Sequence, residues 1–219
     1  MSDVDRRIAA IGQSPVLAVL SGPSGVGKDT VVGLLEQSGH DVVRIVTYTT
    51  RAPRAGEVPG KDYHFVDDAV YHRLLTEDAL IEHATVYDYC YGIPRQPIAE
   101  RLAAGRDALL RVDVQGALTV KARVPSAVLV FLAPPSLAAL EGRLRGRRTE
   151  DEAKLAIRLG AARDEIALLD RFDHAIVSHD GNPQAAAEAL RSILVAERLR
   201  VHPGRPLEEL RAFRLSVAG

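Results

Sequence analysis

Apolar runs and helical patterns alternate along most of this chain. Short apolar runs that are typical of buried strands lie over residues 15–20, 41–46, 107–112, 127–132 and 174–177. Amphipathic stretches with the period of a helix begin near Val31 and continue at 115–123, 136–145, 151–169 and 183–200. Strands that alternate with helices of this length favour βαβ units. The sequence therefore predicts an α/β fold, with a parallel sheet core and helices on both of its faces.

Residues 47–95 break this alternation. They contain short strand-like pieces at 63–66 and 80–86, a short helical piece at 67–75, and four of the chain's six tyrosines, Tyr63, Tyr87, Tyr89 and Tyr91. We interpret the segment as an inserted lobe that follows the second core strand. Polar aromatic residues in such a lobe suit a planar or phosphorylated ligand, although they also suit a small lobe that fills its own core.

The turn after the first apolar run carries the most specific chemistry. It comprises Gly22, Pro23, Ser24, Gly25, Val26, Gly27, Lys28, Asp29 and Thr30. Glycines between a strand and a helix let backbone N–H groups converge on phosphate oxygens, and the helix N-terminus and the lysine add positive charge. The turn therefore predicts a nucleotide phosphate site, with an ordinary tight turn as the alternative.

Asp29 departs from this phosphate-loop pattern, which has Ser or Thr after the lysine. The usual hydroxyl ligates Mg²⁺, and a carboxylate is also a hard oxygen donor that is favourable in the first turn of a helix. We expect Asp29 to act on Mg²⁺ directly or through water. The alternative is that Asp29 only charges the helix start, while Thr30 or water holds the ion.

A second basic cluster lies in the later half of the chain. Four arginines fall within six positions, followed by an acidic helix start, at Arg143, Arg145, Arg147 and Arg148. Such a segment is typical of a mobile phosphate clamp, to which Arg158 and Arg163 on the next helix would add, or of a solvated basic face.

Composition excludes several classes of protein. The 219 residues are 47% apolar, and 28 basic side chains balance 29 acidic ones, which argues against a general nucleic-acid or membrane-surface protein. Cys90 is the only cysteine, so no intramolecular disulfide can form. The first residues lack the apolar core of a secretory signal, and no apolar run approaches a membrane span. We expect a soluble cytoplasmic protein.

The block from Thr47 to Phe65, with sequence TYTTRAPRAGEVPGKDYHF, is similar to the GMP-binding signature of guanylate kinases, and the resemblance extends from about Val16 to Leu199. It implies an enzyme that transfers the γ-phosphate of ATP to GMP, with Mg²⁺ bound as ATP·Mg²⁺. It also implies the P-loop nucleoside-monophosphate-kinase fold, with a small inserted α+β lobe for GMP and an arginine-rich lid. The partners would be small molecules, with no nucleic acid and no membrane, and the protein a monomer or homodimer.

The resemblance also assigns roles to residues. Arg51, Arg54 and Tyr63 would hold the GMP phosphate, Thr47 and Glu82 would contact the guanine edge, and Glu57 and Tyr91 would line the same pocket. Asp113 would lie between the nucleotides near Mg²⁺, and Arg143 and Arg147 of the lid, with Arg158 and Lys28, would be catalytic. These assignments are chemically reasonable: paired guanidinium groups fork around a phosphate, and a carboxylate accepts from both N1–H and the amine of guanine.

The resemblance predicts one domain over residues 1–200, divided into a core of 14–46 and 96–200, a GMP-binding lobe of 47–95, and a lid of about 141–158 within the core. The tail, 201–219, is expected to be peripheral.

Three further positions depart from the common family pattern. Ile93 replaces a Ser or Thr that bonds guanine, Arg111 replaces an acid, and Ser178 replaces an Asn beside adenine. Together with Asp29, these residues resemble a branch of guanylate kinases that includes organellar and some bacterial forms. The alternatives are a ribose 1,5-bisphosphate phosphokinase on the same fold, and a non-catalytic guanylate-kinase-like interaction module.

Overall fold

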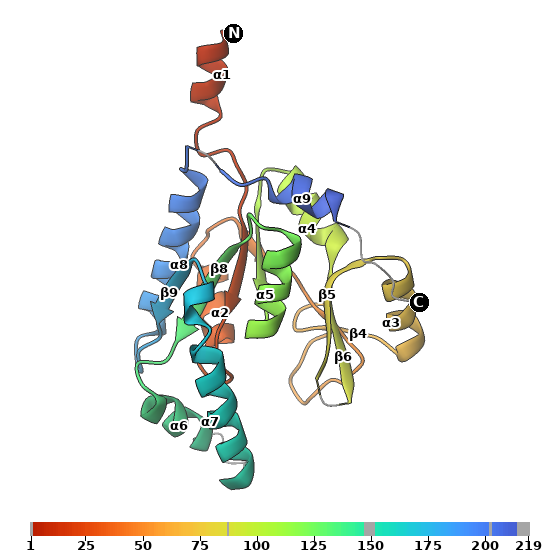
Figure 1. The fold of residues 1–219 in the computed structure, drawn as a ribbon, viewed down its shortest axis with the longest axis vertical. Coiled ribbons are helices and arrows are strands. Elements are labelled where there is room, and N and C mark those ends of the chain that lie inside the picture. The colour runs from red at the N-terminus through yellow and green to blue at the C-terminus, as the bar shows by residue number, and fades with distance from the viewer. Residues whose placement is uncertain (1, 87, 147–151, 202, 214–219) are drawn as a thin grey trace.

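A computed structural model of the protein describes residues 2–86, 88–146, 152–201 and 203–213. Its centre is a parallel sheet of five strands in the order β2-β7-β1-β8-β9 (Figure 1). The strands come from the five predicted runs: β1 Leu17–Ser21, β2 Val42–Arg44, β7 Asp107–Arg111, β8 Val128–Ala133 and β9 His174–Val177. The predicted α/β fold with a parallel sheet is confirmed, although β2 is shorter than its apolar run.

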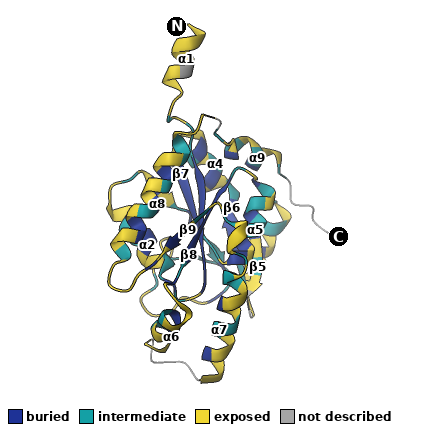
Figure 2. Cartoon of the chain, turned by 60° about the vertical axis from the view of Figure 1, so that its left-hand side comes forward, coloured by how far each residue is buried: buried dark blue, intermediate teal, exposed yellow. Residues whose placement is uncertain are grey.

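Strand β1 sends alternate side chains into two hydrophobic layers. Ala18 and Leu20 pack against helices α2 and α8, whereas Leu17 and Val19 pack against α4 and α5. These helices are α2 Lys28–Gln37, α4 Arg95–Ala103, α5 Val114–Arg123 and α8 Pro183–Arg198. Figure 2 shows the buried strands between helices whose outer faces are exposed. Helix α4 was not predicted, because its fully buried residues are few, namely Ile98 and Leu102.

Residues of the predicted lobe form a second sheet, in the order β4-β3-β6-β5. Its elements are β3 Tyr48–Thr49, β4 His64–Phe65, β5 Leu80–Val86 and β6 Tyr89–Pro94, with helix α3 Asp68–Thr76. Ile81 and Ile93 from this sheet are buried in the same hydrophobic cluster as Leu17 and Ile98 of the core. The segment is therefore a lobe that shares a core with the parallel sheet, and its boundaries at residues 47 and 95 stay a prediction.

The lid region lies beyond the carboxyl end of β8 (Figure 1). It consists of α6 Leu137–Arg145 and α7 Glu152–Ile166, and a 3-10 turn, η1 Leu169–Arg171, follows it. The two helices pack through a small apolar cluster of their own that includes Leu144 and Leu155. The predicted helix over 151–169 thus ends at Ile166 and gives way to η1. Arg147 and Arg148, in the predicted clamp, and Tyr87 of the lobe lie outside the described residues.

The tail over the described residues 203–213 is not peripheral, contrary to the sequence expectation. The N-terminal helix, α1 Asp3–Ala9, projects from the body of the protein in Figure 1, and the last described helix is α9 Pro206–Ala212. Leu210 of α9 is 1% exposed in the core cluster, and Glu209 accepts hydrogen bonds from Ser126. Arg95 donates to the carbonyl oxygens of Leu210 and Phe213. Within the described residues, no helix combines the length and apolar character needed to cross a membrane.

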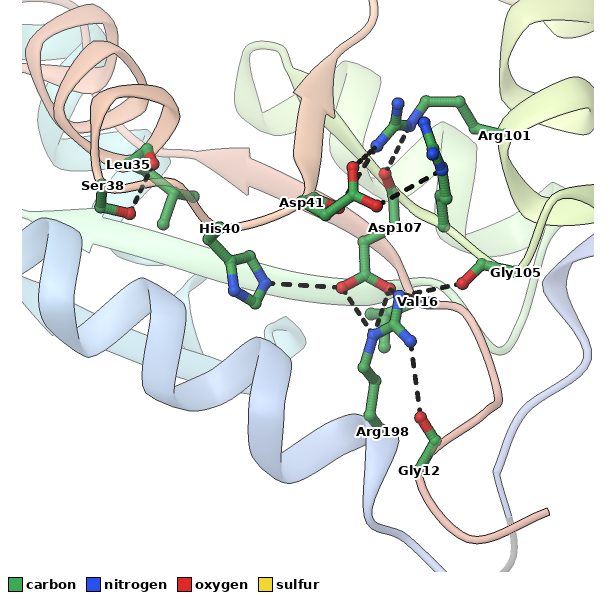
Figure 3. Close-up of polar contacts among 11 residues, drawn as sticks. Gly12, Val16, Leu35, Ser38, His40, Asp41, Arg101, Gly105, Asp107 and Arg198 are labelled. Carbon is green, nitrogen blue, oxygen red and sulfur yellow. Dashed lines mark hydrogen bonds and ion pairs between the residues drawn. The ribbon is translucent and has the colours of Figure 1, made fainter. Parts of the chain in front are cut away.

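A buried carboxylate fastens the end of the sheet opposite to the glycine turn (Figure 3). Asp107, at the start of β7, accepts from the backbone N–H of Val16 at 2.8 Å and from Arg198 Nε at 2.9 Å. Arg198 in turn donates to the backbone oxygens of Gly12 and Gly105. The pair therefore joins the beginnings of β1 and β7 to the last turn of α8.

Asp107→Asn should lower the free energy of unfolding by about 3 kcal/mol, because it leaves Arg198 without its charged partner in a largely buried site. Urea unfolding followed by circular dichroism measures this loss. Asp41→Asn is the matched control, since the Asp41 carboxylate is 62% exposed beside Arg101, and its unfolding midpoint should stay close to wild type. Similar midpoints for both variants would contradict the structural role of Asp107.

Candidate active site

The glycine turn forms the floor of the site, between the end of β1 and the start of α2. Gly22 has φ +132°, and a Cβ on it would lie 2.2 Å from the carbonyl oxygen of Leu132. Gly27 precedes Lys28 with φ +105°, which L side chains rarely adopt. The turn is therefore built for glycine, and it leaves the first N–H groups of α2 without intrahelical partners, as a phosphate site requires.

The Lys28 ammonium lies inside this turn. Its Nζ donates to the carbonyl oxygens of Gly22 and Pro23, the latter at 3.1 Å. Burial lowers the pKa of Lys28 to about 8, while the Glu165 carboxylate on α7 acts in the opposite direction. Because these hydrogen-bond partners are neutral carbonyls, an incoming anion would stabilise the ammonium.

Two arginines predicted to be catalytic contact the turn from the lid side. Arg158 Nη2 donates to Ser24 Oγ at 2.7 Å. Arg143 Nη1 donates to Val26 O at 2.9 Å, and its other nitrogens bond Ser178 O and Asp180. In this structure Arg143 therefore braces the turn against the loop after β9, whereas the position of Arg147 lies outside the described residues.

A cavity of 340 Å³ joins the turn to the lobe. Ser24 and Lys28 line it from the turn, and the residues that line it from the lobe include Thr47, Tyr63, Glu82, Tyr91 and Ile93. Arg111, Val112, Asp113 and Gly116, at the end of β7 and the start of α5, form another part of its wall. Residues predicted for both ligands thus meet around one space, whereas Arg51, Arg54 and Glu57 do not line it.

The lobe holds the predicted phosphate-binding residues in a tight turn. Arg51 Nη2 donates to both oxygens of Glu57, at 2.8 and 3.0 Å, and the backbone N–H of Arg54 donates to the same carboxylate at 2.7 Å. The Arg51 guanidinium carbon lies 5.5 Å from the centre of the Tyr63 ring. Glu57 therefore organises the turn, and the hydrogen bond from Arg51 lowers the pKa of Glu57. The Arg54 side chain is exposed.

Glu82 is a buried carboxyl group on the cavity wall, 6% exposed. Burial, with a further contribution from Asp113, raises its pKa to about 7, and Arg123 opposes the shift. The Asp113 carboxylate also caps α5, where it accepts from the backbone N–H of Gly116 at 2.7 Å. Ile93 lines the cavity and is also buried in the core, so its side chain forms a part of the cavity wall that has no hydrogen-bond donor.

Asp29 and Thr30 are exposed on the first turn of α2. Asp29 Oδ1 accepts from Arg111 Nη1 at 2.5 Å. Sequence reasoning treated Asp29 and Arg111 as separate departures and did not foresee this pair. It also missed Glu165, although Glu165 lies seven residues from Arg158, on the same face of a helix.

Comparisons with known proteins agree with this geometry. The guanylate kinase family model matches residues 14–197. The chain is 42% identical to a guanylate kinase of Leifsonia xyli subsp. xyli, over 93% of this chain and 78% of that protein. It is 46% identical to one of Gloeobacter violaceus, over 83% and 87%. The crystal structure of a guanylate kinase from Anaplasma phagocytophilum superposes with a TM-score of 0.70 at 33% identity, covering 85% of this chain and 88% of that one. This chain therefore belongs to the guanylate kinase family, the nucleoside monophosphate kinases that transfer phosphate from ATP to GMP.

Proposed function

We propose that this chain transfers the γ-phosphate of ATP to GMP in the 340 Å³ cavity between the glycine turn and the lobe. The observation that carries the proposal is that Ser24 and Lys28 share this cavity with Tyr63, Glu82 and Tyr91. A phosphoryl transfer enzyme needs two phosphorylated ligands placed head to head, and one cavity with both sets of residues on its walls supplies that arrangement.

ATP occupies the glycine turn. The free N–H groups at the start of α2 bind its phosphate oxygens, and Lys28 follows the γ-phosphate as it moves. Arg158, already bonded to Ser24, and Arg143 and Arg147 of the lid add positive charge where the transition state gathers negative charge. Closure of the lid excludes water and so limits hydrolysis of ATP.

Mg²⁺ accompanies ATP in this proposal. Asp29 and Thr30 present hard oxygen donors on the exposed first turn of α2, and Mg²⁺ needs only one or two such protein ligands beside phosphate oxygens and water. The residues therefore fit the ion. When bound, it neutralises charge on the β- and γ-phosphates.

GMP occupies the lobe. Arg51, Arg54 and Tyr63 bind its phosphate, and Glu57 keeps Arg51 in position. Thr47 and Glu82 bind the base, and Tyr91 lines the same pocket. An oxygen of the GMP phosphate attacks the γ-phosphorus, and the bond from that phosphorus to the β-γ bridging oxygen breaks, so that ADP and GDP form. No general base is needed, since a phosphate oxygen is already a competent nucleophile. The single-domain division and the cytoplasmic, monomeric or dimeric state stay predictions.

A comparison of acceptors tests this function. Steady-state turnover with ATP·Mg²⁺ should be fastest with GMP, slower with IMP, which lacks the exocyclic amine, and slowest with AMP and ribose 1,5-bisphosphate. Preference for the sugar phosphate would support the sugar-kinase alternative. Binding of GMP without turnover of any acceptor would support the non-catalytic module.

A further inference from the structure

Arg111 occupies the boundary between the two predicted phosphate sites. It is the last residue of β7, where the carboxyl ends of the parallel strands meet, and it lines the cavity together with Lys28 and Tyr63. Its side chain is only 16% exposed. Neither the glycine turn nor the GMP-binding signature includes this residue.

The Arg111 guanidinium contacts both sites at once. Nη1 donates to Asp29 on α2, the residue that follows the turn's lysine. Nη2 donates to the hydroxyl of Tyr63 at 3.1 Å, the phenol assigned to the GMP phosphate. The guanidinium carbon lies 5.6 Å from the centre of the Tyr63 ring, and that of Arg51 lies 5.5 Å from the same centre. Two guanidinium groups therefore converge on one phenol.

One of the three guanidinium nitrogens of Arg111 has no hydrogen-bond partner among the described residues. This nitrogen, Nε, is buried. A buried donor without a partner is unfavourable, because it has lost its hydrogen bonds to water and gained none in return. One carboxylate and one phenol thus do not saturate this guanidinium, whereas a phosphate, with three terminal oxygens, presents more acceptors in the planar geometry that arginine favours.

The same contact explains two departures from the family pattern together. Position 29 has an acid in place of a hydroxyl, and position 111 has a base in place of an acid. The two residues are 82 positions apart, yet the fold joins them in one ion pair. In this chain the end of β7 thus carries a positive charge, and the start of α2 carries the negative charge that pairs with it.

We infer that Arg111 is a phosphate-binding residue that contacts the phosphate of GMP, as a third guanidinium beside Arg51 and Arg54. The Asp29 carboxylate stands in for that phosphate before GMP arrives. The inference rests on the proposed function, because it takes the Tyr63 side of the cavity as the acceptor site. It places a specificity contact for the phosphate in the core sheet rather than in the lobe.

Binding measurements without ATP or Mg²⁺ test this role. GMP and guanosine are titrated by calorimetry into the wild type, Arg111→Met, Arg111→Lys, Asp29→Asn and the control Arg191→Met, whose arginine is exposed on α8. Arg111→Met should raise the Kd for GMP about 10- to 100-fold, the value of a charge-assisted hydrogen bond or two. Its Kd for guanosine should change less than about threefold, because guanosine carries no phosphate. The Kd of Arg111→Lys for GMP should lie between those of wild type and Arg111→Met, and the Kd of Arg191→Met should equal that of wild type.

Asp29→Asn separates a phosphate contact from a structural ion pair. It breaks the pair but leaves the guanidinium, so it should keep the preference for GMP over guanosine. Equal loss of that preference in Asp29→Asn and Arg111→Met would overturn the inference, as would equal weakening of GMP and guanosine by Arg111→Met in a variant that stays folded by circular dichroism. A wild-type protein that binds GMP no better than guanosine would instead refute the proposed function.

Discussion

Lys28→Met should lower kcat/KM for ATP by about 10³-fold, while the protein stays folded. An ammonium aimed at the transferring phosphate stabilises charge that is largest in the transition state, and removal of one such group typically costs two to three orders of magnitude or more. Methionine retains the length and apolar stem of lysine and loses only the charge. The effect is therefore one of electrostatics rather than of packing.

The stability of this variant should not fall with its activity. Burial holds the pKa of Lys28 at about 8 in the folded protein, below the 10.5 of an unburied lysine. The folded state therefore disfavours the charged form, and between these two pKa values the unfolded chain binds the proton more tightly. Removal of the ammonium should leave the free energy of unfolding at pH 7 equal to or above that of wild type, as expected where function is favoured over stability.

Steady-state assays with ATP·Mg²⁺ and GMP, together with urea unfolding, measure both effects. Lys154→Met is the matched control, because Lys154 is exposed on α7, and it should change neither quantity. Activity of Lys28→Met within tenfold of wild type would refute its assigned role. A large loss of stability would show that the activity was lost through misfolding.

Glu82→Gln should lower kcat/KM for GMP about 10²-fold and remove most of the preference for GMP over AMP. A carboxylate accepts from two guanine donors, whereas an amide has a single acceptor oxygen and adds donors that oppose those of guanine. In a buried site, donors left unpaired make the loss large. The Kd for ATP should change little, since Glu82 lies on the lobe side of the cavity.

The wild-type pH profile provides a second readout for Glu82. Burial, with a smaller contribution from Asp113, raises the pKa of this carboxyl to about 7. Below that pH the group is protonated and loses an acceptor, so kcat/KM for GMP should fall as the pH drops below about 7. The phosphate group of GMP also titrates, near pH 6. Glu82→Gln separates the two titrations, because kcat/KM of this variant should not fall near pH 7. Glu77→Gln, an exposed substitution in the same lobe, should show the same fall near pH 7 as wild type. An unchanged profile and unchanged base preference in Glu82→Gln would show that guanine is recognised elsewhere.

The sequence alone was enough to predict the elements that are marked by a pattern among a few neighbouring residues. The alternation of apolar runs predicted the strands of the parallel sheet, because a strand buried on both faces needs a continuous apolar run. The glycine turn was equally readable, since Gly22 and Gly27 adopt backbone conformations that few other residues tolerate. Helix α4 escaped prediction because its buried side is marked by few residues, Ile98 and Leu102.

Tertiary structure alone decided the features that depend on residues far apart in the chain. The tail looks peripheral in the sequence, but Leu210 is buried, because other elements of the core supply the hydrophobic partners of Leu210. The raised pKa of Glu82 depends on burial and on Asp113, 31 residues further along the chain. Arg111 and Asp29 each look like a lost contact in the sequence, and only the parallel arrangement of β1 and β7 brings them together. Periodicity and turn chemistry report the conformation of a few neighbouring residues, whereas desolvation and charge pairing depend on which distant groups the fold places side by side.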